Sequence, residues 1–207
     1  MAVEMIHRFV PGASLTAPTI LALHGTGGDE NDLIPLARMV SADSAVLSPR
    51  GRVLENGMPR FFRRLAEGVF DQEDLKLRTA ELADFLSTAA RQHAFDPSRI
   101  VALGYSNGAN IAASLLLSKP GVLAGGILLR AMVPFEPDAV QDLHGARVLL
   151  SAGRQDPIVP ASQTTRLADV LRQGGADVTL SWSDAGHALL PREMEQAARW
   201  FADRYPS

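Results

Sequence analysis

One serine of the sequence lies in a setting that could make it a nucleophile. Residues 104–108 read GYSNG, a Gly-x-Ser-x-Gly motif with Ser106 at its centre. The apolar run 100–103 precedes the motif and a segment of helical composition, 110–117, follows it. A strand that turns this sharply into a helix holds the serine in an unfavourable backbone conformation and projects its hydroxyl beyond the strand's carboxyl end. The alternative is that Ser106 only caps the helix.

A serine hydroxyl needs a general base, and that base needs an acid to orient it. His24 and His187 follow predicted strands, and catalytic groups of parallel sheets gather at the carboxyl ends of strands. His187 comes late in the chain, and the order serine, acid, histidine recurs among serine hydrolases, so we predict that His187 is the base. His24 is predicted to be a structural imidazole that braces the loop after it. The remaining histidines precede strands or lie within one: His7, His93 and His144.

The acid should follow a strand between the serine and the histidine. Asp156, in the run GRQDPIVP at 153–160, comes just after the predicted strand 147–151. Asp184 is a rival, because it lies three residues before His187. A carboxylate so close in sequence tends to bond the local backbone, so we favour Asp156.

Hydrolysis through a tetrahedral intermediate also needs donors for the oxyanion. We predict the backbone N–H groups of Asn107, directly after the serine, and of Thr26, in the glycine-rich loop 23–30 (LHGTGGDE). Such a loop could instead cradle a phosphate. The chain lacks both a Gly-Lys-Ser/Thr signature and a Gly-x-Gly-x-x-Gly turn into a helix, which disfavours nucleotide binding.

Short apolar runs alternate with longer segments of helical period, which predicts an α/β fold with a mostly parallel sheet covered on both faces. The first strand has no crossover helix after it and is expected to be an antiparallel edge. Residues 49–70 are expected to be irregular. The predicted strands are 3–10, 19–23, 45–47, 100–103, 125–129, 147–151 and 178–182, and the predicted helices are 31–40, 73–93, 107–117, 161–173 and 191–204.

Composition narrows the class of protein. The 207 residues fit one domain, 1–207, and the 46% hydrophobic and 21% charged content is that of a globular protein. The formal net charge of −3 gives no basic excess for nucleic acid. The sequence has no cysteine, which excludes disulfides and cysteine-ligated metal sites. No signal peptide or membrane span is recognised, so we expect a cytoplasmic protein.

Several motifs together resemble one family. They are LHGTGGDEND at 23–32, MPRFFRR at 58–64, GYSNG at 104–108, LRAMVP at 129–134, GRQDPIVP at 153–160 and GH at 186–187. In this order they resemble the bacterial phospholipase/carboxylesterase family of small α/β-hydrolases. The resemblance implies a single α/β-hydrolase domain of about seven strands without a cap domain, related to acyl-protein thioesterases and lysophospholipases. Related dienelactone hydrolases place a cysteine at the nucleophile, and this chain has none.

The sequence therefore predicts a serine carboxylesterase that hydrolyses small or short-acyl carboxylic esters through an acyl-enzyme. Ser106, Asp156 and His187 would act without a cofactor or metal, on a small-molecule ester. Alternatives are an acyl thioesterase or lysophospholipase with the same three residues, or a non-catalytic binding protein on the same scaffold. We expect no nucleic-acid or membrane partner and leave a homodimer open.

The substrate pocket is the least constrained prediction. An acyl pocket is predicted to be lined by Phe61, Phe62, Met132, Val133 and Ile158, although core packing would explain each residue equally well. The arginines at 60, 63, 64 and 130 could select an anionic substrate, but ion pairs within the protein are the commoner role for such residues.

Overall fold

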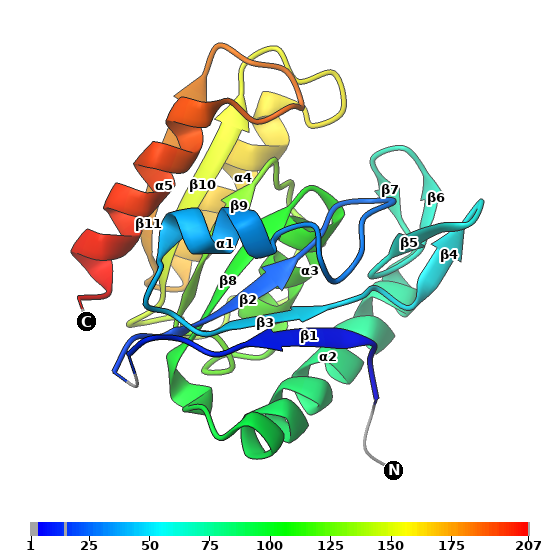
Figure 1. Cartoon of the computed structure of the whole chain (residues 1–207). Coiled ribbons are helices and arrows are strands. Elements are labelled where there is room, and N and C mark those ends of the chain that lie inside the picture. Colours follow the sequence, from blue (N-terminus) through cyan, green and yellow to red (C-terminus); the bar gives the residue numbers. More distant parts are fainter. Residues whose placement is uncertain (1–3, 15, 207) are drawn as a thin grey trace.

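A computed structural model describes residues 4–14 and 16–206 as an α/β fold around one seven-stranded sheet. The strand order is β1-β3-β2-β8-β9-β10-β11 (Figure 1). β1 pairs with β3 antiparallel and every other pair in this sheet is parallel, as predicted. The sheet strands are β1 (His7–Val10), β2 (Thr19–Leu23), β3 (Val46–Pro49), β8 (Ile100–Tyr105), β9 (Gly125–Leu129), β10 (Arg147–Gly153) and β11 (Asp177–Ser183).

Helices cover both faces of the sheet, because its central strands are apolar on both sides. All five residues of β2 and all five of β9 are buried. α2, α3 and α4 pack on one face, while α1 and α5 lie together on the other (Figure 1). No helix in the described part of the chain is both long and apolar enough to cross a membrane. The helices are α1 (Ile34–Val40), α2 (Gln72–His93), α3 (Asn107–Ser118), α4 (Ala161–Gln173) and α5 (Pro191–Arg204), with a 3₁₀ turn at Pro97–Arg99.

Two predicted elements are shorter in the structure. The strand predicted over 3–10 begins at His7, and Val3 lies outside the described residues. His7 is opposite Pro49, and one more backbone bond, from Arg50 N–H to Ile6 O at 2.7 Å, joins the two segments before they part. The helix predicted from residue 31 begins at Ile34, because the carboxylate of Asp29 accepts the backbone N–H of Asn31 at 2.7 Å and forms a turn first.

Residues 49–70 are ordered rather than irregular, which corrects the prediction. β4 (Val53–Glu55) and β5 (Met58–Arg60) form one hairpin, and β6 (Arg64–Ala66) and β7 (Val69–Phe70) form another. Asn56 and Gly57 join the first pair with φ values of 52° and 81°. An Asn-Gly pair with two positive φ angles is the preferred two-residue hairpin turn, so the sequence did carry a signal for this element. Both hairpins lie on one side of the sheet (Figure 1).

Candidate active site

Ser106 sits on a strained turn between β8 and α3. Its φ and ψ are 52° and −113°, a conformation that non-glycine residues rarely adopt. A Cβ at Gly104 would lie 2.7 Å from the backbone of Ala109, and one at Gly108 would lie 2.0 Å from the carbonyl oxygen of Leu23. Both glycines of the motif are therefore required by close packing. The Ser106 hydroxyl makes no capping bond to α3, so the helix-cap alternative does not describe it.

The structure brings Ser106, His187 and Asp156 into one hydrogen-bonded chain. His187 Nε2 lies 3.0 Å from Ser106 Oγ, and His187 Nδ1 lies 2.8 Å from Asp156 Oδ2. Because a carboxylate only accepts, Nδ1 carries the proton and Nε2 is free to accept the serine proton. The other carboxylate oxygen of Asp156 accepts the backbone N–H groups of Ile158 and Val159 at 2.8 and 3.0 Å. The Asp156 side chain is only 1% exposed, so its direction is fixed.

The rival acid is elsewhere. The side chain of Asp184 is 78% exposed and lies 3.6 Å from the guanidinium of Arg154. It makes no hydrogen bond to His187 within the described residues. The geometry therefore selects Asp156 as the partner of the imidazole.

The other histidines are structural or remote. His24 is buried; its Nε2 accepts the backbone N–H of Gly51 at 2.9 Å, and its Nδ1 donates to Gly25 O at 2.6 Å. Burial lowers the pKa of His24, which favours the neutral ring that this pair of bonds requires. His7, on the edge strand β1, bonds His93, at the end of α2, at 3.0 Å; β1 lies at the opposite side of the sheet from β11, the strand that precedes His187.

The predicted oxyanion donors are braced by the first hairpin. Within residues 4–14 and 16–206, the backbone N–H groups of Thr26 and Asn107 have no acceptor. Arg60 Nη1 donates to Thr26 Oγ1 at 2.7 Å, and Pro59 O accepts the backbone N–H of Gly27 at 2.9 Å. The backbone N–H of Phe61 donates to Asn107 Oδ1 at 2.7 Å. Sequence reasoning missed this bracing, although the Asn-Gly turn signals the hairpin that provides it.

A cavity of about 350 Å³ opens beside Ser106 and His187. Met132 and Ile158 line it, as predicted. Phe61, Phe62 and Val133 do not, which corrects the predicted pocket. Phe61 packs on the His24 ring with centroids 4.7 Å apart, Phe62 is fully buried, and Val133 packs against the core on the α2, α3 and α4 side.

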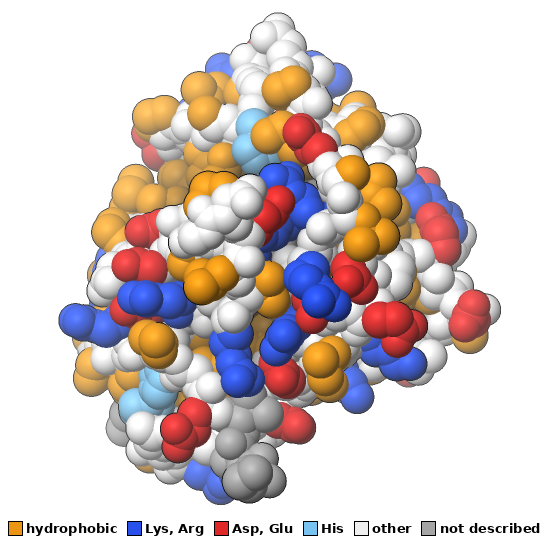
Figure 2. All heavy atoms as spheres, turned by 90° about the vertical axis from the view of Figure 1, so that its right-hand side faces the viewer, with side chains coloured by type: hydrophobic (Ala, Val, Ile, Leu, Met, Phe, Trp, Pro, Cys, Tyr) orange, Lys and Arg blue, Asp and Glu red, His pale blue; other side chains and the backbone are white. Residues whose placement is uncertain are grey.

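The arginines beside the cavity are paired with acids. Glu55 lies 3.1 Å from Arg60 and 2.9 Å from Arg64, and the bond from Arg64 holds the pKa of the Glu55 carboxyl below its usual range. Arg63 pairs with Asp71 at 3.0 Å. Figure 2 shows the face that carries the hairpins, where basic and acidic side chains are interspersed around the centre. These arginines therefore serve ion pairs within the protein, the commoner of the two roles considered.

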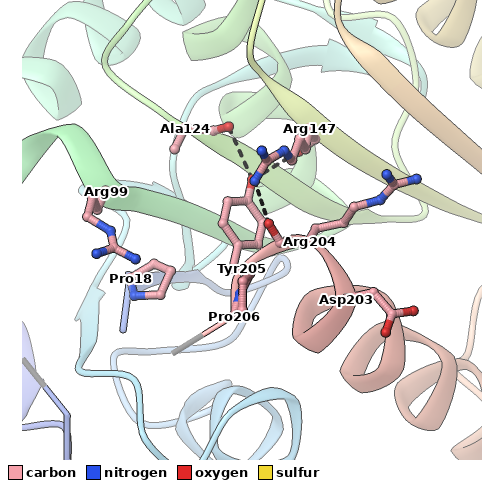
Figure 3. A pocket seen from close by; sticks show the side chains of 8 residues that line it. All are labelled: Pro18, Arg99, Ala124, Arg147, Asp203, Arg204, Tyr205 and Pro206. Carbon is pink, nitrogen blue, oxygen red and sulfur yellow. Dashed lines mark hydrogen bonds between the residues drawn. The ribbon is translucent and has the colours of Figure 1, made fainter. Parts of the chain in front are cut away.

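A second cavity, of about 550 Å³, lies at the other end of the parallel strands, where they begin. Arg99 and Arg147 lie on either side of the Tyr205 ring, whereas Arg204 points away from it (Figure 3). The tyrosine hydroxyl donates to Ala124 O at 3.1 Å. The lining contains no serine or histidine, so this cavity offers no nucleophile and base pair.

Comparison with known proteins identifies the family. The family model described as phospholipase/carboxylesterase matches residues 6–203. The chain belongs to the phospholipase/carboxylesterase family. It is an α/β-hydrolase and an ester-bond hydrolase by class, as the sequence predicted.

Three similar proteins illustrate the family. A crystal structure of a Bacillus cereus carboxylesterase is 49% identical, covers 97% of this chain and 95% of that one, and superimposes with a TM-score of 0.96. The Bacillus subtilis protein MhqD, whose name marks it as an unproven hydrolase, is 49% identical over 199 residues, 96% of this chain and 98% of its own. Acyl-protein thioesterase 1 of Cryptococcus neoformans var. neoformans is 24% identical over 235 residues, which cover 98% of this chain and 99% of that protein.

Proposed function

We propose that this family member is a single-domain serine carboxylesterase that hydrolyses small or short-acyl carboxylic esters through an acyl-enzyme. One observation carries the proposal: the hydrogen-bonded chain from Ser106 through His187 to Asp156 opens onto a cavity of about 350 Å³. A nucleophile, a base with a defined tautomer and a buried acid are the parts that acyl transfer requires.

In the acylation half of the reaction, Ser106 Oγ attacks the ester carbonyl carbon and its proton passes to His187 Nε2. The carbonyl oxygen becomes an oxyanion, which accepts the N–H groups of Thr26 and Asn107. The C–O bond to the alcohol then breaks. The departing alkoxide takes the proton from His187, and the acyl group remains on Ser106.

In the deacylation half, water attacks the acyl carbon while His187 Nε2 accepts a proton from it. The bond to Ser106 Oγ breaks, the serine regains its proton from His187, and the carboxylic acid leaves. Throughout, the carboxylate of Asp156 stabilises the imidazolium that forms on His187. His187 relays every proton in this scheme.

The mixed wall of the cavity supports small acyl groups. Met132, Ile158 and Val159 offer apolar contact, while Arg60 and Asn110 close the wall with polar side chains. Each methylene buried against the apolar side gains about 0.8 kcal/mol, but only until that side is filled. The two hairpins flank the cavity without forming a helical cap.

A series of p-nitrophenyl esters from acetate to palmitate tests the proposal. We expect kcat/KM to rise over the first few acyl carbons, with acetate to hexanoate exceeding laurate and palmitate, and no activation by substrate aggregates. A steady rise to palmitate would replace short-ester hydrolysis by lysophospholipase or thioesterase activity. A complete absence of turnover would support a non-catalytic binding protein.

A thioesterase is the second candidate, and the relative named acyl-protein thioesterase 1 favours it. The same three residues would form the same acyl-enzyme from a thioester. Matched butyryl and octanoyl oxygen esters and thioesters would separate the two by their ratio of kcat/KM. We expect the oxygen esters to be the better substrates.

We also propose that the enzyme is cytoplasmic, because its cysteine-free composition suits a reducing compartment.

A further inference from the structure

Arg130 occupies an unusual position next to the catalytic turn. It follows β9 directly, is fully buried, and has a φ of 59°, which is uncommon for a residue with a side chain. Its backbone N–H donates to Ser151 O at 2.9 Å in β10. The residue before it, Leu129, accepts the backbone N–H of Ser106 at 2.9 Å. The strained conformation of Arg130 is thus held by both neighbouring strands.

The guanidinium of Arg130 uses all five of its N–H donors inside the protein. Nε donates to Gly186 O at 2.9 Å, and Nη2 donates to Ala188 O at 2.8 Å. Nη1 donates to Ser151 O at 3.3 Å. The remaining two donors reach the two carboxylate oxygens of Glu193, both at 2.8 Å.

Two of these acceptors flank the catalytic histidine. Gly186 and Ala188 stand on either side of His187, so one planar group holds the carbonyls before and after it. The carbonyl of His187 itself accepts the Tyr105 hydroxyl at 3.1 Å. Three successive carbonyls of this loop therefore have fixed partners, although the loop contains no helix or strand.

Glu193 fixes the guanidinium in turn. Its carboxylate accepts the hydroxyls of Ser151 and Ser183 at 2.7 and 3.0 Å and the backbone N–H of Leu190 at 2.8 Å. Groups from β10, β11 and the start of α5 thus meet at a carboxylate that is 4% exposed. Arg130 is consequently tied to the rigid part of the fold rather than to solvent.

We propose that Arg130 is a positioning residue, whose guanidinium holds the backbone around His187 so that Nε2 stays 3.0 Å from Ser106 Oγ. Its Nε also lies 4.0 Å from Asp156 Oδ2, so its positive charge faces the acid of the triad. The inference rests on the proposed esterase function. In this role Arg130 binds the backbone on either side of His187 and does not bind an anionic substrate.

Arg130→Lys is the decisive variant, because lysine keeps the charge but has no planar fork to reach both carbonyls. We expect kcat on p-nitrophenyl acetate to fall on the order of 10- to 100-fold, since small misplacement of a catalytic group is enough for such a loss. KM should stay within about twofold. Wild-type kcat in Arg130→Lys would overturn the proposal.

Two further variants separate positioning from general destabilisation. Met194→Ala, in the buried face of α5 next to Glu193, should lower Tm at least as much as Arg130→Lys while leaving kcat unchanged. Glu193→Gln keeps both carbonyl bonds of Arg130, so we expect a smaller loss of kcat than in Arg130→Lys. We call the bonds from Arg130 to the carbonyls of Gly186 and Ala188 the clamp. The clamp would be refuted if Met194→Ala lost kcat in proportion to its loss of Tm. It would also be refuted if Glu193→Gln lost more kcat than Arg130→Lys.

Proton NMR of the substrate-free protein tests the clamp independently of turnover. The His187 Nδ1 proton, bonded to Asp156, should give a downfield resonance in wild type and Met194→Ala and a weakened or lost one in Arg130→Lys. If wild type hydrolyses no ester, the proposed function fails while this readout still judges the clamp. If wild type is active and the resonance is intact in Arg130→Lys, the clamp alone fails.

Discussion

The parallel strands of the central sheet have a cavity at each end. We call the side where the strands finish the carboxyl edge and the side where they begin the amino edge. The larger of the two cavities is not the candidate active site. The carboxyl edge has about 350 Å³ beside Ser106 and His187, whereas the amino edge has about 550 Å³ around Tyr205. At the carboxyl edge, a strained serine, a histidine and a buried carboxylate are joined by hydrogen bonds of 3.0 and 2.8 Å. Hydrogen-bond connectivity, not volume, distinguishes the two edges.

The amino edge is built for anchoring the chain's last helix. The Tyr205 hydroxyl donates to Ala124 O, and the guanidinium of Arg147 lies 5.4 Å from the centre of its ring (Figure 3). Burial raises the pKa of Tyr205, so the phenol stays protonated and remains a donor. Arg147 donates to the backbone carbonyl of Arg204, and Arg204 pairs with Asp177 at 3.1 Å, so these two arginines and the tyrosine serve contacts within the protein.

The largest effect should come from breaking the hydrogen bonds that join Ser106, His187 and Asp156. We expect Ser106→Ala and His187→Ala each to lower kcat on p-nitrophenyl acetate by a factor on the order of 10⁴ or more, because neither residue works without the other. The double variant should be little worse than either single variant. Near-additive losses would show that the two residues do not act as one unit.

The next effect concerns stability and pH. The pKa of Glu193 is lowered to about 2, since its bonds from Arg130, Leu190 and Ser151 outweigh the opposing effect of burial. A carboxyl with a depressed pKa in the folded state stabilises the fold above its unfolded pKa, near 4.5, and loses that stabilisation as pH falls toward 2. The shift corresponds to about 3 kcal/mol of unfolding free energy.

Urea unfolding of wild type and Glu193→Gln between pH 6 and pH 2.5 checks this expectation. The variant should be less stable at pH 6 and should lose less stability on acidification than wild type. Glu195→Gln, on the exposed side of the same helix, is the matched control and should follow wild type. Parallel pH curves for wild type and Glu193→Gln would contradict the assignment.

A third comparison sets two aspartates at the same edge against each other. Asp156→Asn should lower kcat/KM by a factor of about 100 or more, because the amide cannot hold the imidazole tautomer and does not stabilise the imidazolium. Asp184→Asn, at a residue that faces solvent beside Arg154, should leave kcat/KM within about twofold. The opposite ranking would move the acid of the triad to Asp184.

The smallest catalytic effect is expected at the amino edge. Tyr205→Phe removes one hydrogen bond and should lower the free energy of unfolding by about 1 kcal/mol. It should leave kcat/KM on p-nitrophenyl acetate unchanged within about twofold. A large loss of activity at constant fold would show that the two edges are coupled, and the contrast between them would not hold.

Much of the carboxyl edge was predictable because its residues lie within or beside regular elements. The GYSNG motif between an apolar strand and a helix located Ser106, and the positions of Asp156 and His187 directly after predicted strands placed both at the carboxyl ends of strands. Asp184 could be set aside by local reasoning, since a carboxylate three residues away bonds its own surroundings more readily than the imidazole. Short-range pattern and topology were sufficient for these residues.

The supporting residues were not predictable in the same way. The role of Arg60 depends on a hairpin that folds back to the oxyanion loop, and only the Asn56-Gly57 pair signals that hairpin. Arg130 lies 56 residues before Gly186, whose carbonyl it holds, and no periodicity reports such a contact. The Phe61 and Phe62 assignments were wrong because adjacent aromatics between an active-site hairpin and the core can face either one.

The most direct test of the central claim is to trap the acyl-enzyme. Wild-type protein would be mixed with p-nitrophenyl acetate, quenched in acid during the first turnovers, digested and analysed by mass spectrometry, with Ser106→Ala as control. We expect one acetyl group on the peptide containing Ser106, a matching burst of p-nitrophenol, and neither signal in the variant. Hydrolysis without a labelled Ser106 peptide, or an equal burst from Ser106→Ala, would contradict nucleophilic catalysis by this serine.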